Sequence, residues 1–295
     1  MGITEDKDID ARKDKTGDAL KAQRFQMLKD IAKELEGEVV FPTCFDAALR
    51  LRKELQNPDV HIERISKFII IEPLILAKLM RMANSVIYNP TGAPARNPTE
   101  AINRLGLNVV RSTILAIAMN QLMRAKELVP FSDVATNLWE HSIVTAAAAQ
   151  VLANAKSRLN PESAMLAGLV HDLGAFYTLY RSVQYPELRI RPESIRYLIV
   201  EWHESIGETL LNALELPEEI AHAVIDHDRP KVLPVTFLSF QDIIYVANLI
   251  AGACPSWLKI NDERLGALTK QARESYAGLL PEIEKNAKEM KSIFT

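Results

Sequence analysis

The sequence predicts an all-α fold, and three observations support this prediction. Apolar residues recur every three or four positions, the spacing of amphipathic helices, as they do at Leu20, Phe25, Leu28, Ile31 and Leu35. No segment alternates apolar and polar residues for long enough to indicate a half-buried strand. Proline, glycine or a capping residue marks the edge of several periodic segments.

The N-terminal half is predicted to contain a charged leader followed by helices. Residues 1 to about 18 carry few large apolar side chains and predict a loose leader. The amphipathic helix that follows ends at Gly37 and either packs on its own domain, the preferred interpretation, or binds a partner. Thr43 with Asp46 resembles a capping box, and Gly106 divides two adjacent helices. The expected helices span residues 18–36, 41–55, 61–71, 73–86, 98–106 and 108–122, with a surface loop at 89–99.

The C-terminal half is predicted to be helical from about residue 132. Ser132 and Asp133 are candidate N-caps. Asn160 as cap and Pro161 in the first turn begin a helix that Gly174 is expected to end. The expected helices span residues 137–155, 160–174, 191–216, 217–228 and 239–253, with a stiff loop at 229–234 and a more polar helical tail to residue 295.

Composition and charge exclude several classes of protein. The chain of 295 residues is 48% hydrophobic and 25% charged, which is ordinary for a soluble globular protein. Its net charge of −3 provides no overall basic field to attract nucleic acid. It has no apolar run of the roughly 18 residues that cross a bilayer, and its acidic start is unlike a signal peptide. We therefore expect a cytoplasmic protein without membrane or nucleic-acid partners, in which Cys44 and Cys254 are free thiols.

Four of the six histidines fall on or at the ends of four separate predicted helices. They are His141, His171, His203 and His227, and the second is followed directly by Asp172. Side chains that project inward from several helices of a bundle can build a metal site. A lone histidine on an apolar helix face is more often a hydrogen-bonded core residue. With four histidines and a carboxylate, the two interpretations are evenly balanced.

Six segments together resemble the HDOD proteins, bacterial signalling domains related to the HD-domain metal-dependent phosphohydrolases. The resemblance runs from about Phe41 to Gly252 and implies an N-terminal helical part packed on a five-helix HD-like part. It implies a domain at 37–252, divided into 37–131 and 132–252, between the leader and helix at 1–36 and a helical tail at 253–295. The segments are EPLILAKLMRMANS (72–85), AINRLGLNVVRSTILAIAM (101–119), LWEHSIVTA (138–146), LAGLVHDLG (166–174), EWHESIGETLLNALELPEEIAHAV (201–224) and VANLIA (246–251).

The resemblance also implies a set of metal ligands, with two departures. The first metal histidine matches His141, and the pair that gives HD proteins their name matches His171 and Asp172. The final metal aspartate matches Asn248, and the lysine that follows the pair in the catalytic HD-GYP branch matches Ala175. The GYP segment itself is missing. The additional ligands of that branch match His203, His227 and Asp228.

The two departures predict a degenerate metal site. Asn248 replaces an anionic ligand by an amide oxygen, which should lower metal affinity. Ala175 removes a cation that would steady a transferring phosphate. A single divalent ion, iron, manganese, zinc, nickel or magnesium, could still lie in a shifted place among Asp172, His203, His227 and Asp228. No cofactor is required, and Asp172 is the catalytic candidate only if the protein is active.

These departures favour a non-catalytic signalling module that acts through its helical surfaces. The alternative is a metal-dependent phosphohydrolase that acts on a nucleotide or another phosphoester. No receiver, kinase or cyclase domain fits into the remaining residues, so the sensor or effector is expected to be a separate signalling protein. Binding of a small molecule or a nucleotide is a further possibility. In either case His141, His171, Asp172 and Asn248 are expected to converge in one buried pocket.

Overall fold

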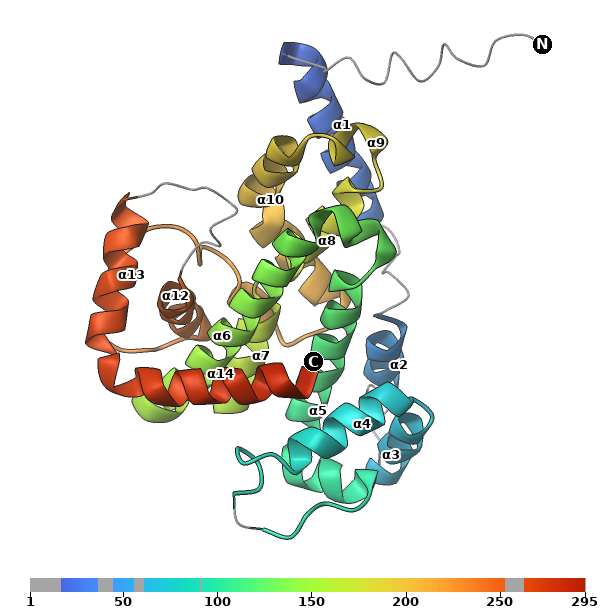
Figure 1. Ribbon diagram of the computed structural model, residues 1–295, viewed down its shortest axis with the longest axis vertical. Coiled ribbons are helices and arrows are strands. Elements are labelled where there is room, and N and C mark those ends of the chain that lie inside the picture. The colour runs from blue at the N-terminus through green and yellow to red at the C-terminus, as the bar shows by residue number, and fades with distance from the viewer. Residues whose placement is uncertain (1–16, 37–44, 56–60, 91, 253–262, 295) are drawn as a thin grey trace, which may run out of the picture.

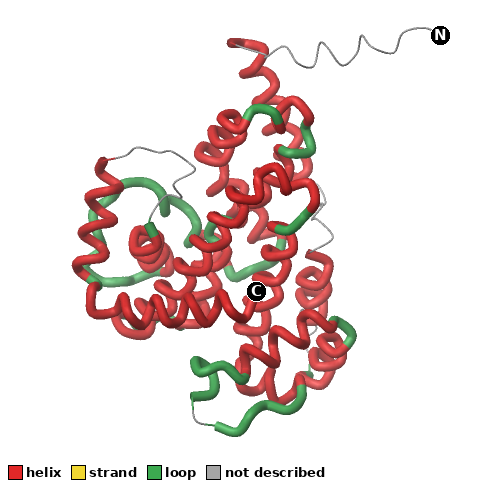
Figure 2. The backbone as a smooth tube through the Cα atoms, viewed as in Figure 1, coloured by secondary structure: helices red, strands yellow, loops and turns green. Residues whose placement is uncertain are grey.

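The computed structural model describes residues 17–36, 45–55, 61–90, 92–252 and 263–294. Every regular element in these ranges is a helix, and they contain no strand (Figure 2). The predicted all-α class is therefore confirmed. None of the described helices is both long and apolar enough to cross a membrane. The predicted leader, the cap at Thr43, the helix end at Gly37 and both cysteines lie outside the described residues.

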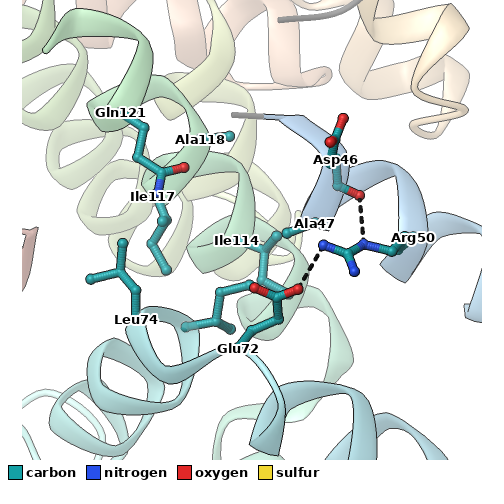
Figure 3. A pocket seen from close by; sticks show the side chains of 10 residues that line it. Asp46, Ala47, Arg50, Glu72, Leu74, Ile114, Ile117, Ala118 and Gln121 are labelled. Atoms are coloured by element: carbon teal, nitrogen blue, oxygen red, sulfur yellow. Dashed lines mark hydrogen bonds and ion pairs between the residues drawn. The ribbon is translucent and has the colours of Figure 1, made fainter. Parts of the chain in front are cut away.

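The N-terminal part consists of five helices, and the first of them lies at the opposite end of the molecule from the next three (Figure 1). Gly106 interrupts the longest of them with φ 76° and ψ 160°, which is the division that the sequence predicts. Arg50 of α2 reaches the Glu72 carboxylate at the start of α4, with 2.6 Å between Nη2 and Oε1 (Figure 3). The helices are α1 (Gly17–Glu36), α2 (Asp46–Leu55), α3 (Ile62–Ile70), α4 (Pro73–Ala83) and α5 (Pro98–Met123).

The first helix packs on its own chain, as the preferred interpretation expects. Met27 and Ile31 of α1 are each 1% exposed. The Arg24 guanidinium donates a hydrogen bond of 3.0 Å to the Ser194 hydroxyl at the start of α10. Phe25 of the same helix is 69% exposed, so the helix buries only part of its apolar face on its own chain.

The remaining helices include α6, an alanine-rich helix that contacts α7, α12 and α14. The last helix, α14, lies across α6 in Figure 1, and the Phe294 ring meets Trp139 edge-on at 5.7 Å. The elements are η3 (Lys126–Phe131), α6 (Ser132–Lys156), α7 (Pro161–Val170), α8 (Leu173–Ser182), α9 (Pro186–Arg189), α10 (Pro192–Ala213), α11 (Glu218–His222), α12 (Phe240–Ala251), α13 (Glu263–Ser275), η5 (Ala277–Leu279) and α14 (Leu280–Phe294).

Three predicted helix ends are wrong. The helix expected over 217–228 ends as α11 at His222, so His227 lies in the turn after it. The short helix η3 runs directly into α6, so Ser132 and Asp133 lie in its first turn and Phe131 stands at the N-cap without a side-chain hydrogen bond. Gly174 does not end α7, because that helix ends at Val170 and Gly174 lies inside α8. Its role is steric, since α8 approaches α10 at this glycine.

Glycines allow two very close helix contacts beside the His171–Asp172 turn. A Cβ added at Gly168 of α7 would lie 2.8 Å from the Ala146 Cα of α6. A Cβ added at Gly174 of α8 would lie 1.9 Å from the His203 carbonyl oxygen of α10. Real Cβ atoms do not come this close to backbone atoms. The two contacts therefore bring the helices that carry the histidines near one another.

We predict that Gly174→Ala lowers the free energy of unfolding by about 2–4 kcal/mol, because backbone atoms of α10 must move to admit the methyl group. The matched control is Gly266→Ala in α13, where an added Cβ would meet open space. Alanine in that helix should be neutral or stabilising by up to about 1 kcal/mol. Denaturant titrations of both variants measure the difference. Equal stability of the two variants would contradict the close packing of α8 on α10.

Candidate metal centre

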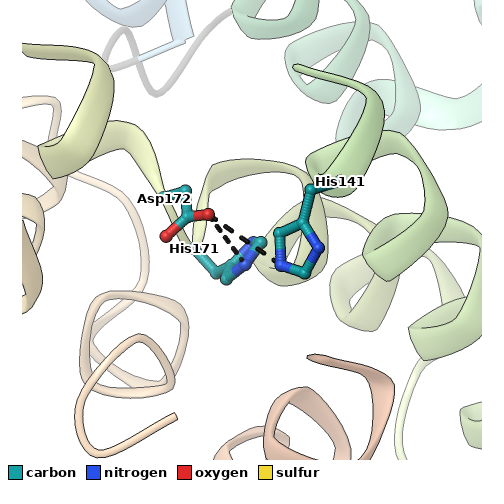
Figure 4. Close-up of side chains that lie close together, drawn as sticks. All are labelled: His141, His171 and Asp172. Atoms are coloured by element: carbon teal, nitrogen blue, oxygen red, sulfur yellow. Dashed lines mark ion pairs between the residues drawn. The ribbon is translucent and has the colours of Figure 1, made fainter. Parts of the chain in front are cut away.

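Six polar side chains from three helices and two turns meet in the interior of the bundle, with His227 supplied by the turn after α11. His141 comes from α6, His203 from α10 and Asn248 from α12. The turn between α7 and α8 supplies the His171 and Asp172 side chains that Figure 4 shows beside His141. The exposed fractions are 0% for His171 and Asn248, 1% for His227, 3% for His203, 4% for Asp172 and 8% for His141.

Three of the histidines are oriented by their own backbone. Each has its Nδ1 atom within hydrogen-bonding distance of a carbonyl oxygen three or four residues earlier. Because a carbonyl only accepts, Nδ1 carries the proton, and in the neutral ring Nε2 presents a lone pair. This is the tautomer that a metal-binding histidine needs. The pairs are His171 with Gly168 at 2.8 Å, His203 with Ile199 at 2.8 Å, and His227 with Val224 at 2.7 Å.

The Asp172 carboxylate lies between two pairs of imidazoles. Its Oδ2 is 3.3 Å from the His171 Nε2 and 4.0 Å from the His141 Nε2. Its Oδ1 is 3.5 Å from the His227 Nε2 and 3.8 Å from the His203 Nε2. Each pair forms with Asp172 a group of ligand atoms that lie within 4.8 Å of one another. Ligand atoms about 2 Å from a shared ion are separated by similar distances, so both groups fit a divalent metal.

The His171 Nε2 atom is buried and has no hydrogen-bond partner among the described residues, because Asp172 lies within 3.3 Å but outside hydrogen-bonding geometry. A buried lone pair without a partner is costly, and an ion would satisfy it. Burial lowers the pKa of His171 to about 3, against the opposing effect of the Asp172 carboxylate. The ring is therefore neutral at physiological pH and ready to bind a cation.

Asn248 positions its neighbours through all of its polar atoms. Its Nδ2 donates to the His227 carbonyl oxygen at 3.0 Å and to the Asp228 Oδ1 at 2.9 Å. These two bonds fix the amide, so that Oδ1 faces the His141 Nε2 at 2.8 Å. The other oxygen of Asp228 lies 3.5 Å from the His203 Nε2. A second carboxylate therefore borders the group formed by Asp172, His203 and His227.

The carboxylates and imidazoles shift one another's protonation. Burial alone would lower the pKa of His227, but Asp228, Asp172 and Glu204 outweigh it and raise the pKa to about 10. Burial alone would raise the pKa of Asp172, but the imidazoles, His171 and His227 foremost, hold it well below its usual range. Without a metal, His227 is therefore protonated beside an ionised Asp172.

The structure brings together all seven residues that the sequence analysis names. Their assignment as metal ligands stays a prediction, because their positions alone do not establish binding. Of the other two histidines, His222 is largely exposed and pairs with Glu208 at 3.6 Å, and His61 precedes α3. The sequence analysis missed Glu204, whose Oε1 lies 3.5 Å from the His227 Nδ1. Its position directly after His203 in the same helix was the available signal.

Four other residues that the sequence singles out lie in different environments. Trp139 packs as expected, whereas Trp202 is 43% exposed and does not enclose the neighbouring histidine. Arg104 donates to the carbonyl oxygens of Ala83 and Ala93 and so joins the end of α4 to the following loop. Ala175 is 1% exposed within α8, so this position offers no cation to a bound phosphate.

Comparison with known proteins identifies the family. The model of the HDOD domain matches residues 41–230. The chain belongs to the HDOD domain family. This membership confirms the resemblance seen in the sequence, and 190 of the 295 residues lie within the match (41–230).

Solved structures extend the similarity over nearly the whole HDOD chain. A crystal structure from Shewanella amazonensis SB2B, named "Putative metal-dependent phosphohydrolase", is 26% identical with a TM-score of 0.69. The alignment covers 93% of this chain and 100% of that one. A "Putative signal transduction protein" from Marinobacter aquaeolei VT8 is 17% identical with a TM-score of 0.51, covering 95% and 68% of the two chains, and shares the fold.

One curated relative is longer than this chain. An uncharacterized protein of Treponema pallidum (strain Nichols) is 22% identical over 218 residues, which are 68% of this chain and 40% of that protein. The HDOD chain therefore corresponds to less than half of the relative's length.

The expectation of a non-catalytic module is wrong. Its basis was the loss of a single acidic ligand at Asn248 and of a lysine at Ala175. The structure instead contains an intact buried cluster of histidine and aspartate, in which two groups share Asp172 and Asp228 stands beside the second. The Shewanella protein that resembles this chain over its full length is named for metal-dependent phosphohydrolysis. Both findings favour the alternative function.

The cluster could hold a metal ion, as the sequence analysis expects. Imidazole nitrogens with carboxylate oxygens suit iron, manganese, nickel and zinc, and suit magnesium less well because it prefers oxygen ligands. The donor atoms do not distinguish among the first four metals.

We predict that Mn²⁺ binds more tightly as pH rises from 6 to 8. A metal must displace the proton that a pKa of about 10 keeps on the His227 ring, so each ion bound there releases a proton. The dissociation constant should fall by up to about tenfold per pH unit. Titration calorimetry in buffers of different ionisation enthalpy measures the proton release directly. Binding heats that do not depend on the buffer would contradict this protonation state.

We predict that Asn248→Asp has opposite effects with and without metal. The new carboxylate would replace a donor that lies 2.9 Å from the Asp228 Oδ1, so the metal-free protein should lose about 1–3 kcal/mol of stability. Added Mn²⁺ should stabilise this variant more than the parent, because it gains an anionic ligand. Thermal denaturation in chelator and in Mn²⁺ tests both effects, with Asn212→Asp on the exposed side of α10 as control. A variant whose metal-induced shift is smaller than the parent's contradicts the role of Asn248.

Proposed function

We propose that this HDOD protein is a metal-dependent phosphohydrolase that acts on a nucleotide or another phosphoester. One observation carries the proposal: the buried Asp172 carboxylate directs one oxygen to each of two pairs of histidine Nε2 atoms. If Asp172 were only a hydrogen-bonded core residue, one partner would be enough for its carboxylate, and four converging imidazoles would not be needed. The similarity to the Shewanella protein supports the same function.

The residues divide into two groups of ligands for divalent metal. His141, His171 and Asp172 form the first group. Asp172, His203 and His227 form the second, with Asp228 at its edge. A bound divalent metal would lower the pKa of a coordinated water to near neutrality and polarise a phosphoryl oxygen.

The chain's own residues orient this centre and leave one side of it open. Backbone carbonyls hold three imidazoles in one tautomer, and Asn248 holds Asp228 in place. The Asp228 side chain is 22% exposed. We therefore propose that solvent and substrate reach the cluster from the side of Asp228. Arg229 follows it in the chain and is the cation we propose for the substrate phosphate, since Ala175 offers none. Arg229 pairs at 3.0 Å with Asp226, largely in solvent, so the pair is easily exchanged.

The proposed partners of this activity are separate signalling proteins, as the sequence analysis expects. We also propose that no organic cofactor takes part, because metal-assisted hydrolysis needs only water as the second reactant.

We predict that Asp172→Asn lowers the hydrolytic rate by at least about 100-fold, since even residues that only orient metal ligands contribute about 10–100-fold. The protein is stripped with chelator and reloaded separately with Mn²⁺, Fe²⁺, Ni²⁺ or Zn²⁺. Hydrolysis of bis-p-nitrophenyl phosphate, p-nitrophenyl phosphate and a panel of nucleotides is then measured. The matched control is Asp133→Asn, an exposed aspartate in the first turn of α6, which should keep the parent's rate.

Two outcomes would contradict the proposed function. One is the absence of turnover with every metal and substrate class although metal analysis shows the centre loaded. The other is turnover that Asp172→Asn leaves unchanged, which would place the reaction elsewhere.

A further inference from the structure

A second feature lies in the N-terminal part, away from the histidine cluster. A groove of about 400 Å³ separates α2 from α4 and α5. We call it the α4–α5 groove. Figure 3 shows Leu74, Ile114 and Ile117 on its apolar side, and Arg50 with Glu72 at its polar end. Its lining also includes Asp46, Ala47, Ile75, Ala118 and Gln121.

The polar end of the groove is satisfied within the chain. The Arg50 guanidinium pairs with the Glu72 carboxylate at 2.6 Å and donates to the Asp46 carbonyl oxygen at 3.4 Å. The positive and negative charges cancel there. This ion pair therefore offers little to a charged ligand. The rest of the lining is apolar apart from the exposed Asp46 and Gln121 side chains.

Exposed apolar side chains continue from the groove onto the surface. Leu74 lines the groove and is 44% exposed. Ile70 and Ile71, in the turn that precedes α4, are 52% and 67% exposed. Isolated exposed residues are normal on protein surfaces, but three within five positions beside a groove are typical of a binding site.

Cationic side chains without partners lie beyond the groove on α4 and α5, the two helices that form its apolar wall. Lys78 lies one turn beyond Leu74 on α4, and Arg81 lies on the next turn. Arg124 follows the groove residue Gln121 by three positions at the end of α5. Among the described residues none of these three cations makes an ion pair or a side-chain hydrogen bond.

The three cations are near one another. Burial, followed by the charges of Arg81 and Arg124, lowers the pKa of Lys78. Like charges that face one another without an acidic partner destabilise a surface locally. They stand out in a chain whose net charge is −3. An acidic partner would relieve the repulsion.

We propose that the α4–α5 groove and the cations Lys78, Arg81 and Arg124 form a docking surface for an acidic, amphipathic segment of a partner protein. An apolar side chain of the segment enters the groove beside Leu74. Its carboxylates pair with the three cations. The volume of the groove suits one large side chain, the kind of buried anchor that supplies most of the binding energy in peptide recognition. The charges supply orientation and rate of association.

The same surface is poorly suited to nucleic acid. Phosphate recognition depends on cations spread along a backbone, and specific reading of unpaired bases adds stacking platforms. Here the cations flank the groove and exposed isoleucines, and none of the described residues that line the groove is aromatic. A protein segment with both acidic and apolar side chains matches all of these features.

The test selects peptides from a random phage-displayed library on the full-length protein. We expect the enriched peptides to share a large apolar residue flanked by aspartate or glutamate. A synthetic fluorescent copy of an enriched peptide is then titrated with the parent and its variants by anisotropy. The combined change Lys78→Glu, Arg81→Glu and Arg124→Glu should weaken binding by at least about tenfold. Leu74→Asp, which leaves all three cations in place, should weaken it similarly.

A matched control inverts three exposed cations elsewhere, Lys270→Glu, Lys285→Glu and Lys288→Glu. This variant has the same net charge as the first, and it should bind within about twofold of the parent, because distant surface charges are screened by salt. Thermal denaturation establishes that each variant is folded, and Leu74→Asp gives an independent reading if the charge-inverted variant is not.

Three results would overturn the proposal. Enriched peptides could lack acidic residues, the control could lose as much affinity as the groove variants, or an oligonucleotide could displace the peptide and bind more tightly. None of these readings depends on hydrolysis, so they are separate from the test of the metal centre.

Discussion

A buried carboxylate surrounded by imidazoles is the constraint on which the rest of this structure depends. Asp172 is 4% exposed, and an ionised carboxylate at such a position is costly unless partners compensate it. Four histidines from different parts of the bundle provide that compensation. Each segment that supplies an imidazole therefore contacts the same carboxylate. The contacts that hold the bundle together are also the contacts that form the candidate metal centre.

The helix packing follows from this requirement. Imidazoles reach a shared carboxylate only if the backbones that carry them approach closely, and glycine makes the approach feasible at two places. Gly168 allows α7 to contact α6, and Gly174 allows α8 to contact α10. The alanines of α6 serve the same purpose on the other side of the contact. These small residues therefore affect the geometry of the candidate metal centre, because the helix spacing that they allow sets the distances between its ligand atoms.

The centre and the α4–α5 groove lie in different parts of the fold. The histidine cluster is assembled by α6 and the helices that follow it, whereas the groove lies among α2, α4 and α5. α5 belongs to the N-terminal part but also contacts α7 and α8, which flank the His171–Asp172 turn. One helix, α5, therefore connects the proposed docking surface with the elements that hold the histidine cluster.

The sequence by itself determined the class of fold and the family, and it named the candidate site residues that the structure brings together. Helical periodicity and caps such as Asn160 are local properties, so they are readable without tertiary contacts. The His–Asp pair and the other histidines were recognisable from their segments, but the domain boundaries remain a prediction.

Only the tertiary structure decided what those residues do together. The sequence analysis counted ligands one at a time, and replacing an aspartate by Asn248 therefore indicated a lost function. Distances through space show that Asp172 serves two groups of histidines and that Asn248 holds Asp228 beside one of them. The same limitation hid Glu204 and misassigned Gly174 as a helix end, because both act across helices. A residue's electrostatic and steric partners are set by packing between distant segments, and local sequence patterns do not contain that information.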